Sequence, residues 1–196
     1  DPGNQPPLAV IDQCILLALC LNIHNTQPSH GLTSEQMSAF VERVIQHPLN
    51  WSVHTMSLLL RSRLEASRTR TVERSTLQLQ ALIDQMPTND SSVRERLRFF
   101  HALELPAKWA MQSELAHRYV SIGVLRSALE TFERVEMWEN VVQCLGLLGR
   151  QQEGIEVVRD LLEGRKTEAE AQLQAKRIAT SAVSYTHLTL PTIYSV

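Results

Sequence analysis

Glycine and proline are scarce inside the apolar segments of this sequence. The 7 glycines are isolated and none is followed directly by a Lys-Ser or Lys-Thr pair, which excludes a glycine-rich phosphate-binding loop. Proline ends helices because it lacks an N–H donor and clashes with the preceding turn. All but one of the 8 prolines lie between apolar segments: Pro2, Pro6, Pro7, Pro28, Pro48, Pro87 and Pro106. The pattern indicates helices separated by short loops.

Cysteine is also scarce, and neither positive nor negative charge predominates. Cys14, Cys20 and Cys144 have no metal-binding spacing and each lies in an apolar segment, so we expect reduced core thiols rather than disulfides or catalytic nucleophiles. The formal net charge of −2 gives no overall attraction to nucleic acid or to an anionic membrane.

No apolar run has the length and composition of a membrane span. The segment "LAVIDQCILLALCLNI" carries Asp12 and lacks the basic region and cleavage site of a signal peptide, so it is better interpreted as a buried helix. Because the sequence begins at Asp1 without a methionine, we expect the natural chain to start earlier.

No group of residues predicts a catalytic, cofactor-binding or metal site. The 7 histidines include no i,i+4 pair of the kind that binds zinc from one helix face. Glu133 and Glu136 are spaced as neighbours on one helix face, and without a cleft they are better explained as solvated. We therefore predict that the protein is not an enzyme and has neither cofactor nor small-molecule substrate.

Apolar residues at three- and four-residue spacing predict an all-α fold. The clearest segments are "LTSEQMSAFVERVIQHP", "WSVHTMSLLLRSRLE" and "TVERSTLQLQALIDQM", and "VRERLRFFHALELP" predicts a shorter helix ended by Pro106. The alternation typical of strands persists nowhere before residue 183. We predict a helical region at 1–106, paired repeats at 107–166, and a polar helix or linker at 167–182.

Small and aromatic residues recur weakly in the predicted repeat region. The first set is Leu115, Ala116, Tyr119, Gly123, Ala128 and Phe132. The second set is Trp138, Val142, Leu145, Gly149, Gly154 and Val158, with Val142 standing 26 residues after Ala116. This matches a degenerate tetratricopeptide pattern, whose usual period is about 34 residues. We predict an α-solenoid of antiparallel helical pairs. Because such units bury their apolar faces against neighbours, we also expect marginal stability and an exposed apolar face near residues 155–162.

Three segments carry a family resemblance. "RTVERSTLQLQALIDQ", "LPAKWAMQSELAHRYVSIGVLRSALETFERVEMWENVVQCLGLLGR" and "LTSEQMSAFVERVIQHPLNWSVHTMSLLLRSRLE" resemble the central part of the tetratricopeptide repeat protein 27 family, most of all its fungal members, and "ALETFERVEMWENVVQC" is the most specific piece. The resemblance covers about Val10 to Lys166. It implies a eukaryotic helical scaffold without enzymatic activity that acts in assembly of large complexes, such as the U5 spliceosomal particle with chaperones, or in fungal cell-wall integrity. The family's N-terminal region and downstream repeats are lacking here.

The segment at 183–196, "VSYTHLTLPTIYSV", differs from the rest of the chain in composition and periodicity. It resembles the translated end of a transposase-based sequencing adapter, including the stop that would follow Val196. We therefore interpret it as non-native and exclude it from reasoning about fold and function.

Five arginines form the one surface that the sequence predicts for binding. They are Arg61, Arg63, Arg68, Arg70 and Arg74, around a predicted turn at 67–71. A solvated turn partly neutralised by Glu65 and Glu73 is one interpretation. Contact with an acidic protein segment is a second, because arginine suits carboxylates, and contact with RNA is a third. We predict a cytoplasmic or nucleocytoplasmic scaffold that binds other proteins, with an RNA-contacting scaffold as the alternative.

Overall fold

The computed structural model describes residues 6–28 and 30–167, and every regular element among these residues is a helix. The predicted all-α fold is therefore confirmed for the described chain. Two compact units are present, Asp1–Ile122 and Gly123–Val196, and we describe each by itself. The predictions for 168–182 and for the tail at 183–196 lie outside the described residues.

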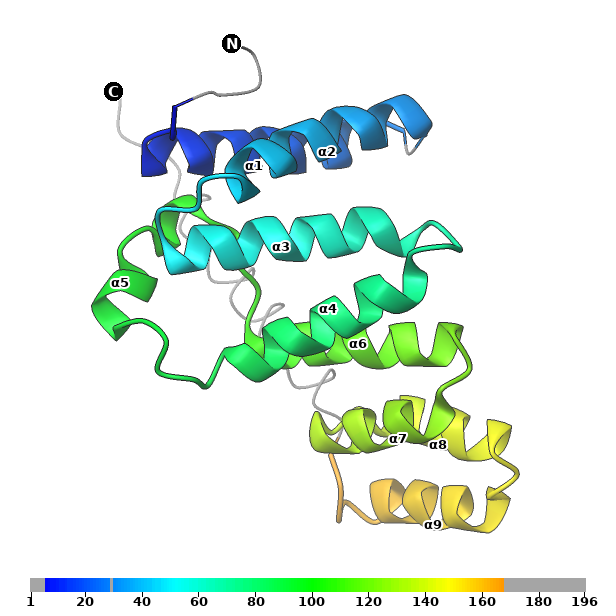
Figure 1. Cartoon of the computed structure of the whole chain (residues 1–196). Coiled ribbons are helices and arrows are strands. Elements are labelled where there is room, and N and C mark those ends of the chain that lie inside the picture. Colours follow the sequence, from blue (N-terminus) through cyan, green and yellow to red (C-terminus); the bar gives the residue numbers. More distant parts are fainter. Residues whose placement is uncertain (1–5, 29, 168–196) are drawn as a thin grey trace, which may run out of the picture. The chain divides into compact units, whose positions relative to one another are not determined.

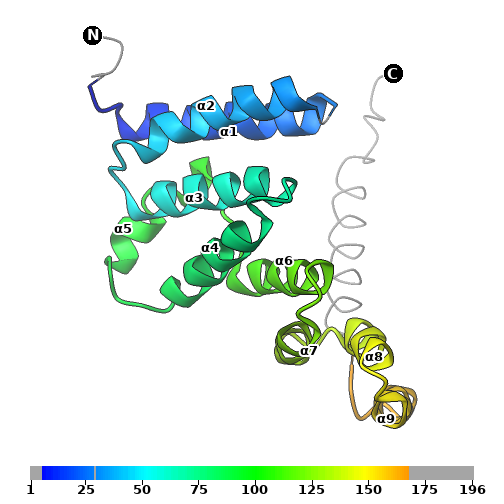
Figure 2. The ribbon, with the colours of Figure 1, turned by 45° about the vertical axis from the view of Figure 1, so that its right-hand side comes forward.

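Unit 1 is a stack of helices that run back and forth. The elements are α1 (Val10–Thr26), α2 (Gly31–Ile45), α3 (Trp51–Ala66), α4 (Val72–Gln85), α5 (Val93–Leu97), a 3-10 turn η1 (Phe100–Ala102) and α6 (Lys108–Ser121). Helices α1 to α4 pack in order, α1 on α2, α2 on α3 and α3 on α4, and α4 packs on α6 (Figures 1 and 2). This is the arrangement expected of antiparallel helical pairs joined by short loops.

The core of unit 1 is built from the apolar stripes that the sequence shows. Its buried members are Cys14, Leu17, Cys20, Ile23, Met37, Val41, Val44, Val53, Met56, Leu59, Leu60, Leu79, Leu82, Ile83, Met111 and Leu115. Two of the three cysteines lie in this core, and burial raises the pKa of Cys20 to about 11. A thiol with so high a pKa remains protonated and is a poor nucleophile. The prediction of core thiols is confirmed, because Cys144 is buried in unit 2 as well.

The helix predicted to run to Pro106 is wrong in length, because α5 ends at Leu97. The carbonyls that would extend it accept hydrogen bonds from the start of α3 instead. Asn50 Nδ2 donates to the Glu95 carbonyl at 3.1 Å, and Ser52 Oγ donates to the Arg96 carbonyl at 2.7 Å. The chain beyond Leu97 continues as the short turn η1 and an extended segment, and this segment forms part of the surface described below.

Helix α6 belongs to unit 1, although the sequence predicted a boundary between residues 106 and 107. Met111 and Leu115 of α6 lie in the core of unit 1. The Tyr119 hydroxyl donates to Gln80 Oε1 of α4 at 3.1 Å. The division therefore falls after Ile122, where the chain leaves this core.

The described part of unit 2, up to residue 167, consists of α7 (Leu125–Arg134), α8 (Trp138–Leu147) and α9 (Gln151–Leu162). Helix α8 packs on both α7 and α9. Gly154 of α9 is buried, and a Cβ at this position would meet Leu145 Cβ at 3.8 Å and Val142 Cγ1 at 3.9 Å. The glycine thus lies where α8 and α9 approach each other.

The three helices of unit 2 end with the same hydrogen bond. At the end of α8, the Arg150 N–H donates to the Leu145 carbonyl at 2.9 Å across a residue with positive φ, as in a Schellman motif. The residues with positive φ are Glu136 (59°) after α7, Gly149 (73°) after α8 and Gly164 (71°) after α9. Glu136 therefore lies past the end of α7, and the prediction that it shares a helix face with Glu133 is wrong.

Substitutions at two of these helix ends should change the free energy of unfolding in opposite directions. Glu136→Gly is expected to raise the free energy of unfolding by about 1 kcal/mol, because glycine adopts positive φ without the steric cost of a Cβ. Gly149→Ala is expected to lower it by about 1 kcal/mol for the same reason. Urea denaturation followed by circular dichroism measures both changes. Equal effects of the same sign would contradict the argument.

Candidate partner-docking surfaces

The predicted arginine surface is largely neutralised within unit 1. Arg61 Nε lies 2.9 Å from Glu65 Oε1, and Arg74 Nη2 lies 2.8 Å from Glu65 Oε2, so one carboxylate serves two arginines. Burial raises the pKa of Glu65, but the hydrogen bonds and charges of Arg61 and Arg74 outweigh it, and the pKa lies below its ordinary value. These two guanidinium groups already have the carboxylate partner that a ligand would supply.

Arg63 belongs to a second ion-pair group that joins three helices. Its Nη2 lies 2.8 Å from Glu114 Oε2 of α6, and Glu114 Oε1 lies 2.6 Å from Nη2 of the buried Arg118. Arg118 Nη1 donates to Ser62 Oγ at 2.7 Å, and Ser62 Oγ donates to the Ser75 carbonyl at 2.8 Å. The group connects α3, α4 and α6. The i,i+4 spacing of Glu114 and Arg118 was the only sign of it in the sequence.

Arg68 and Arg70 are what remains of the predicted arginine surface. Both are exposed in the turn between α3 and α4, and neither forms an ion pair with any residue in the described part of the chain. The surface that the sequence predicted from five arginines therefore presents two free guanidinium groups, with three others joined to carboxylates.

The predicted repeat-packing residues divide between the two units. Leu115, Ala116 and Tyr119 lie on α6 in unit 1, and the first two are buried. In unit 2, buried positions are taken by Ala128, Phe132, Leu145 and Gly154, and half-buried positions by Trp138 and Val142. Gly123 and Gly149 adopt positive φ.

Val158 is 40% exposed and lies with Ile155 and Leu162 on an apolar face of α9, which confirms the predicted exposed face near residues 155–162.

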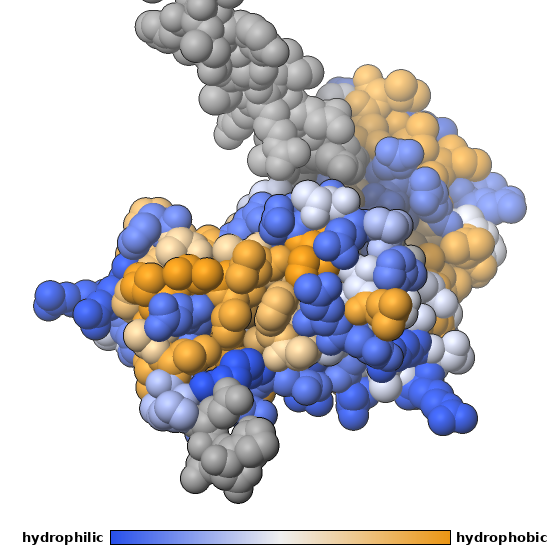
Figure 3. Space-filling model, turned by 90° about the horizontal axis from the view of Figure 1, so that it is seen from above, coloured by the Kyte–Doolittle hydropathy of each residue, from blue (hydrophilic) through white to orange (hydrophobic). Residues whose placement is uncertain are grey.

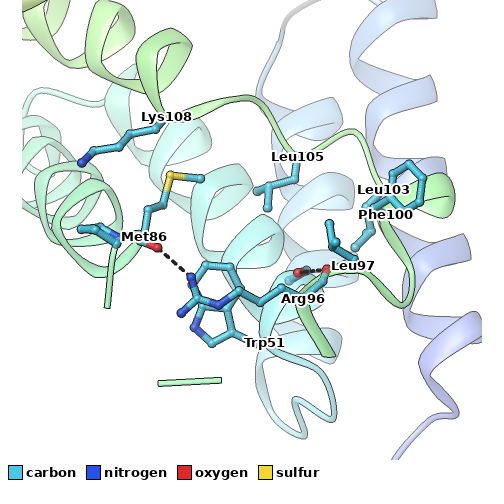
Figure 4. Close-up of a pocket in the computed structure, with 10 residues that line it drawn as sticks. Trp51, Met86, Arg96, Leu97, Phe100, Leu103, Leu105 and Lys108 are labelled. Carbon is cyan, nitrogen blue, oxygen red and sulfur yellow. Dashed lines mark hydrogen bonds between the residues drawn. The ribbon is translucent and has the colours of Figure 1, made fainter. Parts of the chain in front are cut away.

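A pocket of about 590 Å³ lies beside α5 in unit 1 (Figure 4). Its lining is mostly apolar and includes Trp51, Met86, Leu97, Leu103 and Leu105. The volume lies within the range of about 300–1,000 Å³ that is typical of ligand pockets. Nothing in the sequence indicated the pocket, since its lining comes from α3, the loop after α4, α5, and the segment that leads into α6.

Arg96 fixes one wall of this pocket. Its guanidinium group lies 4.0 Å from the centre of the Trp51 ring, and its Nη1 donates to the Met86 carbonyl at 2.6 Å. It also donates to the Thr88 carbonyl and to Ser91 Oγ. Arg96 thus joins the loop after α4 to the first residue of α3, and Figure 4 shows it stacked against Trp51.

Cations and exposed apolar side chains surround the pocket. We define the α5 surface as Arg94, Leu97, Arg98, Phe100 and Lys108. Leu97 is 56% exposed and Phe100 is 65% exposed. Arg94 and Arg98 line a second hollow of about 790 Å³ on the other side of Leu97, and Lys108 lines the first. Within residues 6–28 and 30–167, none of these three cations forms an ion pair.

Helix α1 carries a further exposed apolar face. Ile11, Ile15 and Leu19 follow each other at four-residue spacing and are each about half exposed, at 49%, 52% and 44%. Figure 3 shows apolar side chains gathered on the face that α1 and α2 form. The other side of α1 is buried in the core, so this helix is apolar around most of its circumference.

Neither a metal site nor a helix able to cross a membrane is present in the described residues. No group of three or more histidine, cysteine, aspartate or glutamate side chains there is placed to bind a metal ion. No helix of the described chain combines the length and the hydrophobicity that crossing a membrane requires.

Comparison with known proteins identifies relatives over most of the chain. A TPR repeat-containing protein of Schizosaccharomyces pombe is 41% identical over 83% of this chain, and a tetratricopeptide repeat protein 27 homolog of Dictyostelium discoideum is 39% identical over 82%. A Saccharomyces cerevisiae protein named "Essential for maintenance of the cell wall protein 1" is 29% identical over 87%. The chain spans 24%, 19% and 20% of the length of these relatives.

No protein-family profile and no solved structure matches the chain. The resemblance seen in the sequence is nevertheless confirmed by the identities to the two relatives that are named for their tetratricopeptide repeats. The chain is homologous to one segment of the Schizosaccharomyces pombe TPR repeat-containing protein and to one segment of the Dictyostelium discoideum tetratricopeptide repeat protein 27 homolog.

Proposed function

We propose that the chain is part of a non-enzymatic scaffold that binds other proteins. The observation that carries this proposal is the homology to proteins named for tetratricopeptide repeats, together with a described fold made of antiparallel helices. Such stacked helices offer extended surfaces for partners. The exposed apolar residues of α1, α5 and α9 support the proposal, because exposed apolar patches often mark sites of protein interaction.

We further propose a role in the assembly of large complexes, in the cytoplasm or between cytoplasm and nucleus. This part rests on the family resemblance, which implies spliceosomal ribonucleoprotein assembly or fungal cell-wall integrity. The name of the Saccharomyces cerevisiae relative refers to maintenance of the cell wall. Repeat packing at the two sets of positions from Leu115 to Phe132 and from Trp138 to Val158 remains part of the proposal.

The alternative is a scaffold that contacts RNA through Arg61 to Arg74. The geometry favours it less, because Arg61, Arg63 and Arg74 are paired with Glu65 or Glu114. RNA binding of this kind would depend on Arg68 and Arg70 and would weaken steeply with salt.

Capture from an extract of Schizosaccharomyces pombe cells tests the proposal. We expect the immobilised chain to retain a reproducible set of proteins after ribonuclease treatment and at about 0.3 M salt, where contacts between exposed charges are screened. Loss of the set on ribonuclease treatment would favour the RNA alternative. If the immobilised chain retains no more proteins than an unrelated helical protein does, the scaffold function is contradicted. A set that contains neither ribonucleoprotein components nor chaperones would contradict the assembly role alone.

A further inference from the structure

We propose that the α5 surface binds an acidic segment of a partner protein, which inserts a large apolar side chain into the pocket beside Trp51. The inference rests on the proposed scaffold function and adds the place of binding and the chemistry of the ligand. Two properties of this surface carry it, an apolar pocket and unpaired positive charge on both sides of that pocket.

The pocket and the side chains at its edge form the apolar part of the α5 surface. Leu97 and Phe100 are more than half exposed although both are large and apolar, and Leu103 and Leu105 line the space behind them. Burial of apolar area is favourable in proportion to the area removed from water, so an occupant gains most if it covers these residues. Anchors of protein interfaces are usually large apolar or aromatic side chains that fill such pockets.

The second property is an excess of positive charge in this part of unit 1. Residues 93–108 contain four cations, Arg94, Arg96, Arg98 and Lys108, and two carboxylates, Glu95 and Glu104. Glu95 Oε1 is engaged by the Trp51 backbone N–H at 3.4 Å. Arg96 is engaged by neutral acceptors, so its charge is not cancelled by an ion pair in the described structure. A ligand with carboxylates on both sides of an apolar residue complements this arrangement.

The backbone of the surface is fixed before any ligand arrives. Asn50 and Ser52 bind the carbonyls of Glu95 and Arg96, and Arg96 in turn binds the loop after α4. Binding to a surface that is already ordered avoids part of the entropy cost of association. These contacts also explain why Leu97 and Phe100 are presented outwards instead of continuing a regular helix.

RNA is the less suitable ligand, although aromatic rings and arginines occur together here. Single-stranded nucleic acid binds such surfaces by stacking bases on ring faces. One face of Trp51 is covered by Arg96 at 4.0 Å, and Phe99 has Arg98 at 5.3 Å from its ring centre. The ring of Phe100 meets His101 edge to face and is the most exposed of the three. The surface therefore offers one ring for stacking beside a pocket lined by aliphatic side chains.

Selection from a displayed library of random peptides tests the ligand chemistry directly. The whole chain is immobilised, and we expect enriched peptides to combine aspartate or glutamate with phenylalanine, leucine or tryptophan. Enrichment of basic peptides, of acidic peptides without large apolar residues, or of no peptides at all would overturn the proposal.

Matched variants then test the place of binding with the most enriched peptide, labelled for fluorescence anisotropy. Arg94→Glu combined with Lys108→Glu is expected to weaken binding by about tenfold or more, since it reverses charge on both sides of the pocket. Leu97→Ala combined with Phe100→Ala is expected to weaken it by a similar factor. The control is Arg68→Glu combined with Arg70→Glu, which makes the same change in net charge on free arginines elsewhere in unit 1, and should change affinity by less than about twofold.

The outcomes separate this inference from the function on which it rests. Equal weakening by the two charge-reversed variants would show non-specific attraction and overturn the proposed site. If an oligouridine RNA binds more tightly than the peptide, and the Arg94 and Lys108 variant loses this RNA binding, the proposal that the ligand is a protein is overturned. If that variant still captures the same proteins from the extract, the assignment of the binding site to the α5 surface is wrong and the scaffold function stands. Circular dichroism spectra like that of the unchanged chain show that each variant folds.

Discussion

Replacing Glu114 by glutamine is expected to lower the free energy of unfolding by about 3 kcal/mol at neutral pH. Glu114 is the only described carboxylate paired with Arg63 and with the buried Arg118. Removing its charge leaves a buried guanidinium group without a counter-charge, while the shape of the side chain is kept. Breaking a buried pair from one side is costly because the remaining charge stays desolvated.

The effect of Glu114→Gln should fade in acid. Burial raises the pKa of Glu114, but the hydrogen bonds and charges of Arg63 and Arg118 outweigh it, so the pKa lies below its ordinary value of 4.5. A lowered pKa means that the ionised form stabilises the folded state above about pH 4.5, and this contribution is lost as pH falls through the folded-state pKa. The unchanged chain should therefore lose more stability on acidification than the variant does.

Urea denaturation at neutral and acidic pH measures both effects. The control is Glu42→Gln, because Glu42 is an exposed residue of α2 that forms no ion pair within the described residues. Its substitution should change the free energy of unfolding by less than about 0.5 kcal/mol. Equal losses for Glu42→Gln and Glu114→Gln, or a loss for Glu114→Gln that is independent of pH, would contradict the role of the ion-pair group.

Phe132→Ala is expected to destabilise the chain by about 3–5 kcal/mol. Phe132 is 1% exposed and is the largest of the fully buried side chains, in a unit whose described part has only three helices. Deleting the ring removes its transfer free energy and leaves a cavity that the neighbouring helices fill only in part. Thermal and urea denaturation followed by circular dichroism measure the loss.

Two valines provide a matched control for the effect of burial. Val141 of α8 is fully buried, whereas Val158 of α9 is 40% exposed. Val141→Ala should cost about 2 kcal/mol, and Val158→Ala less than about 1 kcal/mol, because the same two methyl groups are removed from different environments. A larger loss for Val158→Ala than for Val141→Ala would mean that the exposed face of α9 is covered in solution.

The stripes of apolar residues predicted the helices well because side-chain spacing reports directly on helical periodicity. Met37, Val41 and Val44 follow each other at three- and four-residue spacing, and all three are buried on one side of α2. The same reasoning failed after Leu97, where apolar residues continue but the helix does not. The carbonyls at this point bind Asn50 and Ser52, which stand more than 40 residues earlier in the sequence. Periodicity carries no information about such distant partners.

The candidate sites were predicted less well for a related reason. Clustering along the sequence located the arginines but not their partners, and Glu114, which neutralises Arg63, is 51 residues away from it. The sequence did not predict a binding role for Arg94, Arg98 and Lys108, because they lie among helix-forming residues. Only the fold shows that none of the three has a carboxylate partner among the residues that the structure describes.

By itself, the sequence determined that this protein is helical, that its cysteines are core residues and that it is related to tetratricopeptide repeat proteins. These properties depend on composition and local spacing, which every segment carries with it. The tertiary structure alone decided where unit 1 ends, which charges are paired and where an apolar pocket meets unpaired cations. Each of those depends on side chains that are far apart in the sequence and are brought together only when the helices pack.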